Sequence, residues 1–175
     1  MSYQIINDPP NQYTGGNIIS RFMDGLAFRY FWATESLTDT DLAYKPSDTG
    51  MSTLETLEHM VWLSEMIKNA LTGGVSDRAI NQDIKGSPFS DLRKQFLNNV
   101  ELASKMAREK STSELEDLQV VIKSKDKEYP YPLWNMINGP LADAMYHTGQ
   151  IVSFRRSSGN PIPKGVNHLV GKGPF

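Results

Sequence analysis

Three residues from two distant parts of the chain carry side chains that bind divalent metals. Asp143 and His147 are four residues apart, and His59 lies far upstream. On a helix, a spacing of four places two side chains on one face. Together the three would form a set of two histidines and one carboxylate that leaves positions open for water and substrate. Such a set suits Zn, Ni, Fe or Mn, and its donor atoms do not select among them.

The same residues also have a purely structural interpretation. A carboxylate four residues before a histidine is a short pattern that often occurs by chance. An aspartate beside an apolar face can bond a backbone amide or an arginine, and a buried histidine is often a hydrogen-bonded core residue. Both interpretations remain open at this point.

Four other polar residues are candidates for supporting roles. Gln150 lies one turn after His147 and is placed either to orient a metal-bound water or another group around the metal, or simply to close a helix face with a polar residue. Arg155 is placed either to receive an anionic group of a substrate or to favour the end of its helix and hold the tail. Glu55 is better explained as the acid of a helix capping box, and His168, in a glycine-rich tail, is expected to face solvent.

Four long helices are predicted to position these residues. The first spans about residues 16 to 36 and has hardly any polar face. The second opens at a capping box, Ser52 with Glu55, and ends near Gly73. The third begins with Ser90 as its N-cap and extends past residue 106. The fourth starts or kinks at Pro140 and runs to about residue 158, since proline is favourable at a first helical position.

The connections carry turn and strand signals. A second capping box is read at Ser113 with Glu116, and residues 118–129 are predicted to form a short hairpin or an extended loop. Residues 159–175 are expected to be an ordered coil. These elements predict an all-α fold, an up-down four-helix bundle with a long crossover connection and a possible β-hairpin before the last helix.

Composition limits the possible classes of protein. The 175 residues, 39% of them hydrophobic, fit one domain spanning 1–175. A net charge of -2 argues against a nucleic-acid partner. Because the chain has no cysteine, any thiol chemistry must use an external thiol. No basic leader or membrane-spanning stretch is recognised, so we expect a cytoplasmic protein without a membrane partner.

Several stretches, taken in order, resemble the DinB-like superfamily, which includes the YfiT-like proteins. The likeness runs from about residue 18 to residue 161 and rests on residues 37–46, 52–59, 143–150, Arg155 and 159–161. It implies a four-helix bundle, often a homodimer, with a divalent metal held by three histidines. His59 matches the first of these and His147 the last, whereas Asp143 stands where the commoner pattern has histidine.

The resemblance also implies an activity. Family members with an assigned activity are metal-dependent transferases or isomerases that use small cellular thiols. We therefore expect a metal-dependent enzyme acting on a small molecule, such as a thiol S-transferase or a hydrolase, with a low-molecular-weight thiol as substrate. The alternative is a non-catalytic or metal-free helical protein of stress-related or unknown function.

Overall fold

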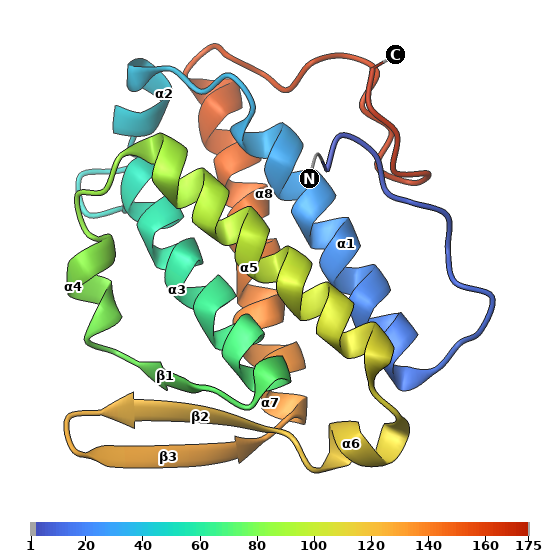
Figure 1. The fold of residues 1–175 in the computed structure, drawn as a ribbon. Coiled ribbons are helices and arrows are strands. Elements are labelled where there is room, and N and C mark those ends of the chain that lie inside the picture. The colour runs from blue at the N-terminus through green and yellow to red at the C-terminus, as the bar shows by residue number, and fades with distance from the viewer. Residues whose placement is uncertain (1–2, 175) are drawn as a thin grey trace.

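Four long helices dominate the computed structural model, which describes residues 3–174 (Figure 1). They are α1 (Gly15–Thr34), α3 (Thr53–Thr72), α5 (Phe89–Glu109) and α8 (Ala142–Ser157). Helices α1 and α3 pack most extensively on α5, and α8 contacts both α1 and α3. The prediction of a mostly helical fold is confirmed. Among the described residues, no helix combines the length and the apolar character needed to cross a membrane.

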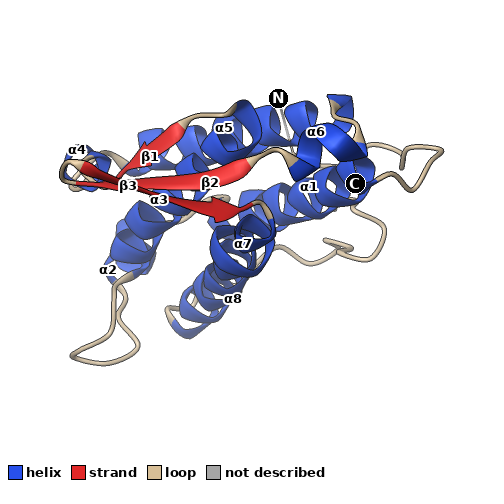
Figure 2. Cartoon of the chain, turned by 90° about the horizontal axis from the view of Figure 1, so that it is seen from below, coloured by secondary structure: helices blue, strands red, loops and turns tan. Residues whose placement is uncertain are grey.

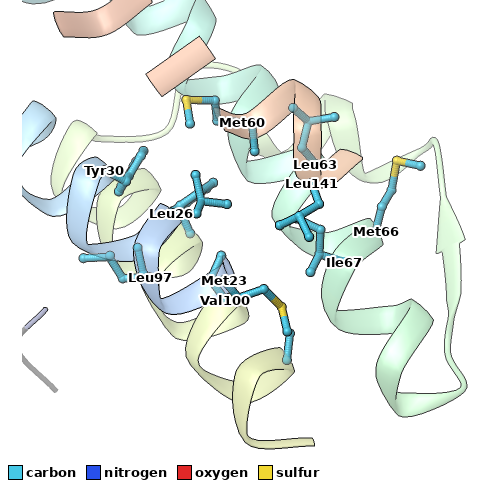
Figure 3. Close-up of a cluster of buried hydrophobic side chains, with 14 of the residues drawn as sticks. Met23, Leu26, Tyr30, Met60, Leu63, Met66, Ile67, Leu97, Val100 and Leu141 are labelled. Carbon is cyan, nitrogen blue, oxygen red and sulfur yellow. The ribbon is translucent and has the colours of Figure 1, made fainter. Parts of the chain in front are cut away.

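The core lies between these helices. Figure 3 shows part of it, where Met23 and Leu26 of α1 face Val100 of α5 while Met60 and Ile67 come from α3. All five side chains are fully buried. Burying each such side chain contributes roughly 1.5–3 kcal/mol, so this apolar interior holds the helices that carry the polar candidates.

Helix α1 approaches α5 closely at one glycine. A Cβ atom on Gly16 would overlap the backbone carbonyl of Ala107, in the last turn of α5. The backbone oxygen cannot move aside as a flexible side chain would. Glycine is therefore required by the packing of the two helices at this point.

The capping residues fix the helix ends, and some differ from the predictions. Helix α3 opens with the predicted Ser52 and Glu55 capping box and ends at Gly73 in the left-handed conformation, as expected. Helix α5, however, begins at Phe89, directly after Pro88, and not at Ser90. Pro88 is itself the N-cap residue, with an extended ψ of 141°, and no side chain caps this helix.

Short helices fill the connections. They are α2 (Asp39–Ala43), α4 (Ile80–Ile84), α6 (Thr112–Glu116) and α7 (Trp134–Met136). The second predicted capping box is wrong by two residues, because Ser111 and Glu114 form it at the start of α6. Helix α2 was not predicted, and it is opened by a further capping box of Thr38 and Asp41.

A small three-stranded sheet lies across the end of the molecule where α3 ends (Figures 1 and 2). Strands β2 (Gln119–Ser124) and β3 (Lys127–Pro132) form the predicted hairpin, which turns at Lys125 with a φ of 55°. Strand β1 (Val75–Asp77), which was not predicted, pairs in parallel with β2. The order is β1-β2-β3, so β3 is an outer strand, and it is exposed along its whole length.

The segment before α8 contains the predicted interruption in a more specific form. A five-residue π-helical turn, η1 (Ile137–Leu141), joins α7 to α8. Inside it, Gly139 leaves helical conformation with φ -97° and ψ -111°, next to Pro140. Proline removes one backbone donor, and the wider π turn accommodates the kink. Helix α8 then begins at Ala142, just before the first candidate ligand.

The tail after α8 is an ordered coil over residues 159–174, as predicted. Asn167 and Lys172 form an isolated β-bridge, and the Ile6 N–H donates to the Gly171 carbonyl. The tail and the N-terminal segment are therefore joined to each other. Residues 1, 2 and 175, which the sequence analysis included in the domain and the tail, lie outside the described residues.

Candidate metal centre

The structure brings His59, Asp143 and His147 together. His59 projects from α3, and the other two project from adjacent turns of α8. One potential ligand atom from each residue lies within 4.8 Å of those of the other two. The predicted spacing of four residues on one helix thus places the pair opposite the single histidine of the facing helix.

Asp143 lies between the two imidazoles. Its Oδ2 is 3.4 Å from His59 Nε2, and its Oδ1 is 3.4 Å from His147 Nε2. The histidine ring centroids are 4.9 Å apart and the rings are nearly perpendicular, at 83°. Two ligands that are each about 2.0–2.1 Å from a metal at a tetrahedral angle are roughly 3.4 Å apart. The two contacts of Asp143 match this spacing, whereas the limit of 4.8 Å for the whole set exceeds it, so a shared divalent cation would draw the side chains closer together.

Gln150 fixes which nitrogen of His147 faces the cluster. The Gln150 Oε1 atom is 2.6 Å from His147 Nδ1. An amide oxygen is only an acceptor, so at this distance Nδ1 must carry the proton and donate it. The Nε2 atom of the neutral ring then keeps its lone pair and is directed toward Asp143. A hydrogen bond of this kind is the usual support of a metal-binding histidine.

The site is open on one side. The His147 side chain is only 12% exposed, whereas His59 is 36% and Asp143 45% exposed. An open cleft of about 570 Å³ adjoins Asp143 and is lined by residues of α3, η1 and α8. A cation held here would be accessible to a small molecule, which a purely structural metal site would not require.

The π turn and the start of α8 determine where Asp143 lies. Asp143 is in the first turn of α8, directly after η1, where the Ala142 N–H bonds to the carbonyls of Ile137 and Gly139. π turns within helices often accompany functional sites. The kink at Gly139 sets the direction in which α8 leaves this turn, and hence the direction of Asp143 and His147.

Glu55 belongs to its helix cap and not to the cluster. Its carboxylate accepts a 2.7 Å hydrogen bond from the Ser52 N–H and lies 3.3 Å from Lys45 Nζ. Hydrogen bonds from Ser52, followed by that from Lys45, lower the pKa of Glu55. This agrees with the interpretation of Glu55 as the acid of the capping box.

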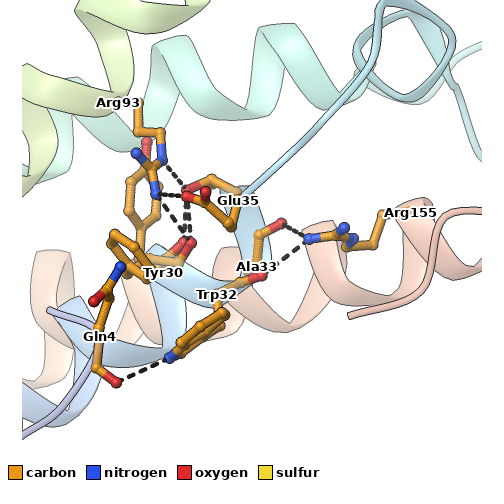
Figure 4. Close-up of polar contacts among 9 residues, drawn as sticks. Gln4, Tyr30, Trp32, Ala33, Glu35, Arg93 and Arg155 are labelled. Carbon is orange, nitrogen blue, oxygen red and sulfur yellow. Dashed lines mark hydrogen bonds and ion pairs between the residues drawn. The ribbon is translucent and has the colours of Figure 1, made fainter. Parts of the chain in front are cut away.

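Arg155 is not placed to receive a substrate anion. The residue is 1% exposed, and its guanidinium group donates to the carbonyls of Trp32 and Ala33 at the end of α1 (Figure 4). It also donates to the backbone and side-chain oxygens of Asn160. Arg155 therefore completes the end of α1 and holds the tail, which was the alternative role considered for it.

His168 lies outside the cluster, as predicted, but it is not surrounded only by solvent. The residue is exposed, and its ring contacts that of Phe28 edge to face, with centroids 5.8 Å apart. Burial, and then the charge of Arg29, lower its pKa. His168 is therefore neutral over a wider pH range than a fully solvated histidine.

No specific function was predicted for three residues near the site. Leu63 and Met66 of α3, together with Tyr146 of α8, line the cleft beside Asp143. The spacings from His59 to Leu63 and then to Met66 are four and three residues, so these positions lie on one helical stripe. That stripe is a signal in the sequence, but the facing π turn that completes the cleft gives no comparable signal.

The comparisons with known proteins identify the fold. No protein-family model and no curated protein sequence matches the chain. A crystal structure of a DinB-like protein from Bacillus subtilis (YjoA) is similar to it, with a TM-score of 0.59 and 16% sequence identity. The similarity covers 83% of this chain and 96% of that one. The chain therefore has a DinB-like fold, as the sequence motifs predicted.

Proposed function

We propose that this DinB-like fold carries a metal-dependent enzyme in which His59, Asp143 and His147 hold one divalent cation. The observation that supports the proposal most is the convergence of three potential ligand atoms within 4.8 Å of one another. The hydrogen bond from His147 to Gln150 adds support, because it directs Nε2 toward the other two ligands. Zn, Ni, Fe and Mn all suit this donor set.

The reaction that we propose is transfer of a small thiol. A divalent cation at this site would supply Lewis acidity, which lowers the pKa of a thiol or water that binds it. Because the chain has no cysteine, the thiol is a substrate. In the transfer, the thiol loses its proton to water and its sulfur forms a bond to an electrophilic carbon. The leaving group departs with the electron pair of the broken bond.

The residues of the chain would share this task. Asp143 offsets part of the cation's charge, and Gln150 holds His147 in one orientation. The solvent-exposed side of His59 and Asp143 admits the substrate.

The proposal extends to a four-helix bundle of α1, α3, α5 and α8 that pairs as a homodimer. Ile18 and Phe22 of α1 are 55% and 45% exposed and would lie in such an interface. Sedimentation equilibrium tests the dimer.

Metal analysis of protein purified without chelator tests the metal site. We expect about one divalent ion per chain in the wild type and a large loss in His147→Ala. His168→Ala is the matched control, since it removes a histidine outside the cluster and is expected to retain the metal. Conjugation of a thiol to a chromogenic electrophile should decrease in parallel with metal content. Equal metal content in His147→Ala and wild type would contradict the proposal.

A second candidate is a non-catalytic protein in which the same residues only join helices. It is favoured by the approach of Asp143 on α8 to His59 on α3, since an ion pair there would hold the two helices together. Under metal-free conditions this alternative predicts a clear loss of thermal stability in His59→Ala. It also predicts that added metal leaves the wild-type melting temperature unchanged, whereas a bound cation would raise it.

A further inference from the structure

The cleft beside Asp143 extends away from the candidate metal centre between α3 and the start of α8. Leu63 and Met66 lie about one and two turns after His59 on α3. Facing them are the π turn, through Asn138, Gly139 and Pro140, and the residues Ala142 and Tyr146 of α8. The cleft is shallow and open to solvent, with a volume of about 570 Å³.

The walls of the cleft are apolar. Leu63 is 5% and Met66 8% exposed, so their few accessible atoms border a surface that is otherwise packed against the core. Figure 3 shows Leu63 beside Leu141, at the contact between α3 and the π turn, and Met66 on the outer side of the same cluster. These side chains give the cleft an apolar floor continuous with the core.

Tyr146 supplies an aromatic wall. It is 64% exposed and lies edge to face against His147, with ring centroids 5.5 Å apart. An aromatic ring that is exposed beside a candidate catalytic group provides a large contact area for a flat ligand, and the nearby Met66 sulfur suits the edge of such a ring. The exposed ring thus adjoins both the cleft and the site.

Charge further restricts what the cleft can hold. Among the described residues that line it, Asp143 is the one acidic residue, and neither lysine nor arginine is present. A carboxylate on a ligand lying here would lose water without gaining a cationic partner, which is unfavourable. Asn138 provides only a neutral polar group.

We infer that this cleft binds the uncharged, apolar body of the substrate, preferably an aromatic ring, while the reacting thiol lies at His59, Asp143 and His147. The inference rests on the proposed function for the position of the thiol. Thiols that carry additional carboxylates are expected to bind poorly, because a carboxylate beside Leu63 and Met66 would find no cationic partner. The apolar cleft would select the substrate by its uncharged ring, and the metal held by the three ligands would act on its thiol.

Two matched probes test the inference. Phenylmethanethiol and 4-(mercaptomethyl)benzoic acid share the thiol and the ring and differ by one carboxylate. Each is titrated into protein labelled at the methionine methyl groups and followed by NMR, both without metal and with Zn²⁺. Met66 reports the cleft, and Met145, which lines a separate cavity beside α1, is the internal control. A Met66→Leu variant assigns the reporting signal.

We expect saturable shifts of the Met66 methyl signal with phenylmethanethiol in both forms of the protein. The carboxylate probe should bind about tenfold more weakly. Asn138→Lys, which adds an amine at the edge of the cleft and keeps the Met66 reporter, should narrow or reverse this preference. Tyr146→Ala should weaken the binding of phenylmethanethiol several-fold. Tyr13→Ala, which removes another exposed tyrosine that lines the separate cavity, should leave it unchanged.

Equal affinity for the two probes, shifts at Met145 without Met66, or no saturable shift in either form would overturn the inference. The metal-free titration keeps this result separate from the proposed function. If Zn²⁺ fails to bind but the Met66 signal still responds selectively to the uncharged probe, the metal site is wrong and the cleft assignment stands. If Zn²⁺ binds and the Met66 signal does not respond, the metal site stands and the cleft assignment is wrong.

Discussion

Replacing Gln150 by leucine should weaken metal binding without removing any ligand. The substitution keeps a side chain of similar size but deletes the oxygen that accepts from His147 Nδ1 at 2.6 Å. Because the His147 side chain is only 12% exposed, water cannot freely replace this acceptor. The ring then loses its preferred orientation and its Nδ1 proton loses its partner.

The magnitude follows from that one contact. Loss of a hydrogen bond whose remaining partner is largely buried costs about 1–3 kcal/mol, and 1.4 kcal/mol corresponds to tenfold in affinity. Residues that support metal ligands in this way typically change affinity about 10–100-fold. We therefore expect Gln150→Leu to raise the dissociation constant for Zn²⁺ at least about tenfold, though less than His147→Ala.

Competition with a chromophoric chelator for Zn²⁺ measures the effect. Gln150→Glu is the informative companion, because its carboxylate still accepts from Nδ1 and should retain wild-type affinity or exceed it. Ser153→Ala removes an exposed hydroxyl on the same helix and serves as the control. Urea unfolding of each metal-free variant checks its stability. Wild-type affinity in Gln150→Leu, or equal losses in the leucine and glutamate variants, would refute the proposed role of Gln150.

Two predictions concern stability. Burial tends to raise the pKa of Asp41, but hydrogen bonds from Asn160, Ser158 and Thr38 outweigh it and lower the pKa from 3.8 to about 2. The ionised form therefore contributes roughly 2–3 kcal/mol, fully present above the unfolded pKa and lost as the pH falls through about 2. In urea unfolding, Asp41→Asn should be destabilised near neutral pH and converge on the wild type near pH 2, and a constant difference would contradict this origin. Gly16→Ala should lower the free energy of unfolding by about 1–3 kcal/mol, because its Cβ would overlap the Ala107 carbonyl. Gly149→Ala is the control, since its Cβ meets open space on α8, and it should leave the stability unchanged or raise it by up to about 1 kcal/mol. Thermal or urea unfolding measures both. Equal effects of the two substitutions on stability would show that the packing of α1 on α5 does not require glycine at position 16.

The candidate site could be largely predicted because it depends on local periodicity. The helical spacing fixes Asp143, His147 and Gln150 on adjacent turns, and the Ser52 capping box sets the start of the helix that carries His59. No local pattern specifies which helices face each other, so the hypothesis that His59 lies opposite Asp143 and His147 rested on their residue types and was strengthened by the resemblance to a known family.

The errors at helix ends have local causes. Both Ser111 with Glu114 and Ser113 with Glu116 fit the spacing of a capping box, and only the path of the chain after α5 selects the first. Ser90 is a good capping residue, but Pro88 lies two residues before it and starts the helix earlier. Sequence patterns of this kind offer alternatives that tertiary structure decides.

Features that depend on distant partners could not be predicted. Arg155 resembles any basic residue near a helix end until the carbonyls of Trp32 and Ala33 are brought to it. Strand β1 has three residues and forms only by pairing with β2, much later in the chain. The π turn likewise depends on how the segment around Gly139 packs against α3.

The outer strand β3 also limits how copies of this protein can associate. Pro130 and Pro132 are alternate residues of this strand, and proline is tolerated in a ladder only where the backbone nitrogen points away from the neighbouring strand. The backbone nitrogens of Glu128, Pro130 and Pro132 point toward the free edge of the sheet, and the two prolines among them have no N–H to donate. An incoming strand would find few donors, so the exposed edge resists intermolecular sheet extension and aggregation.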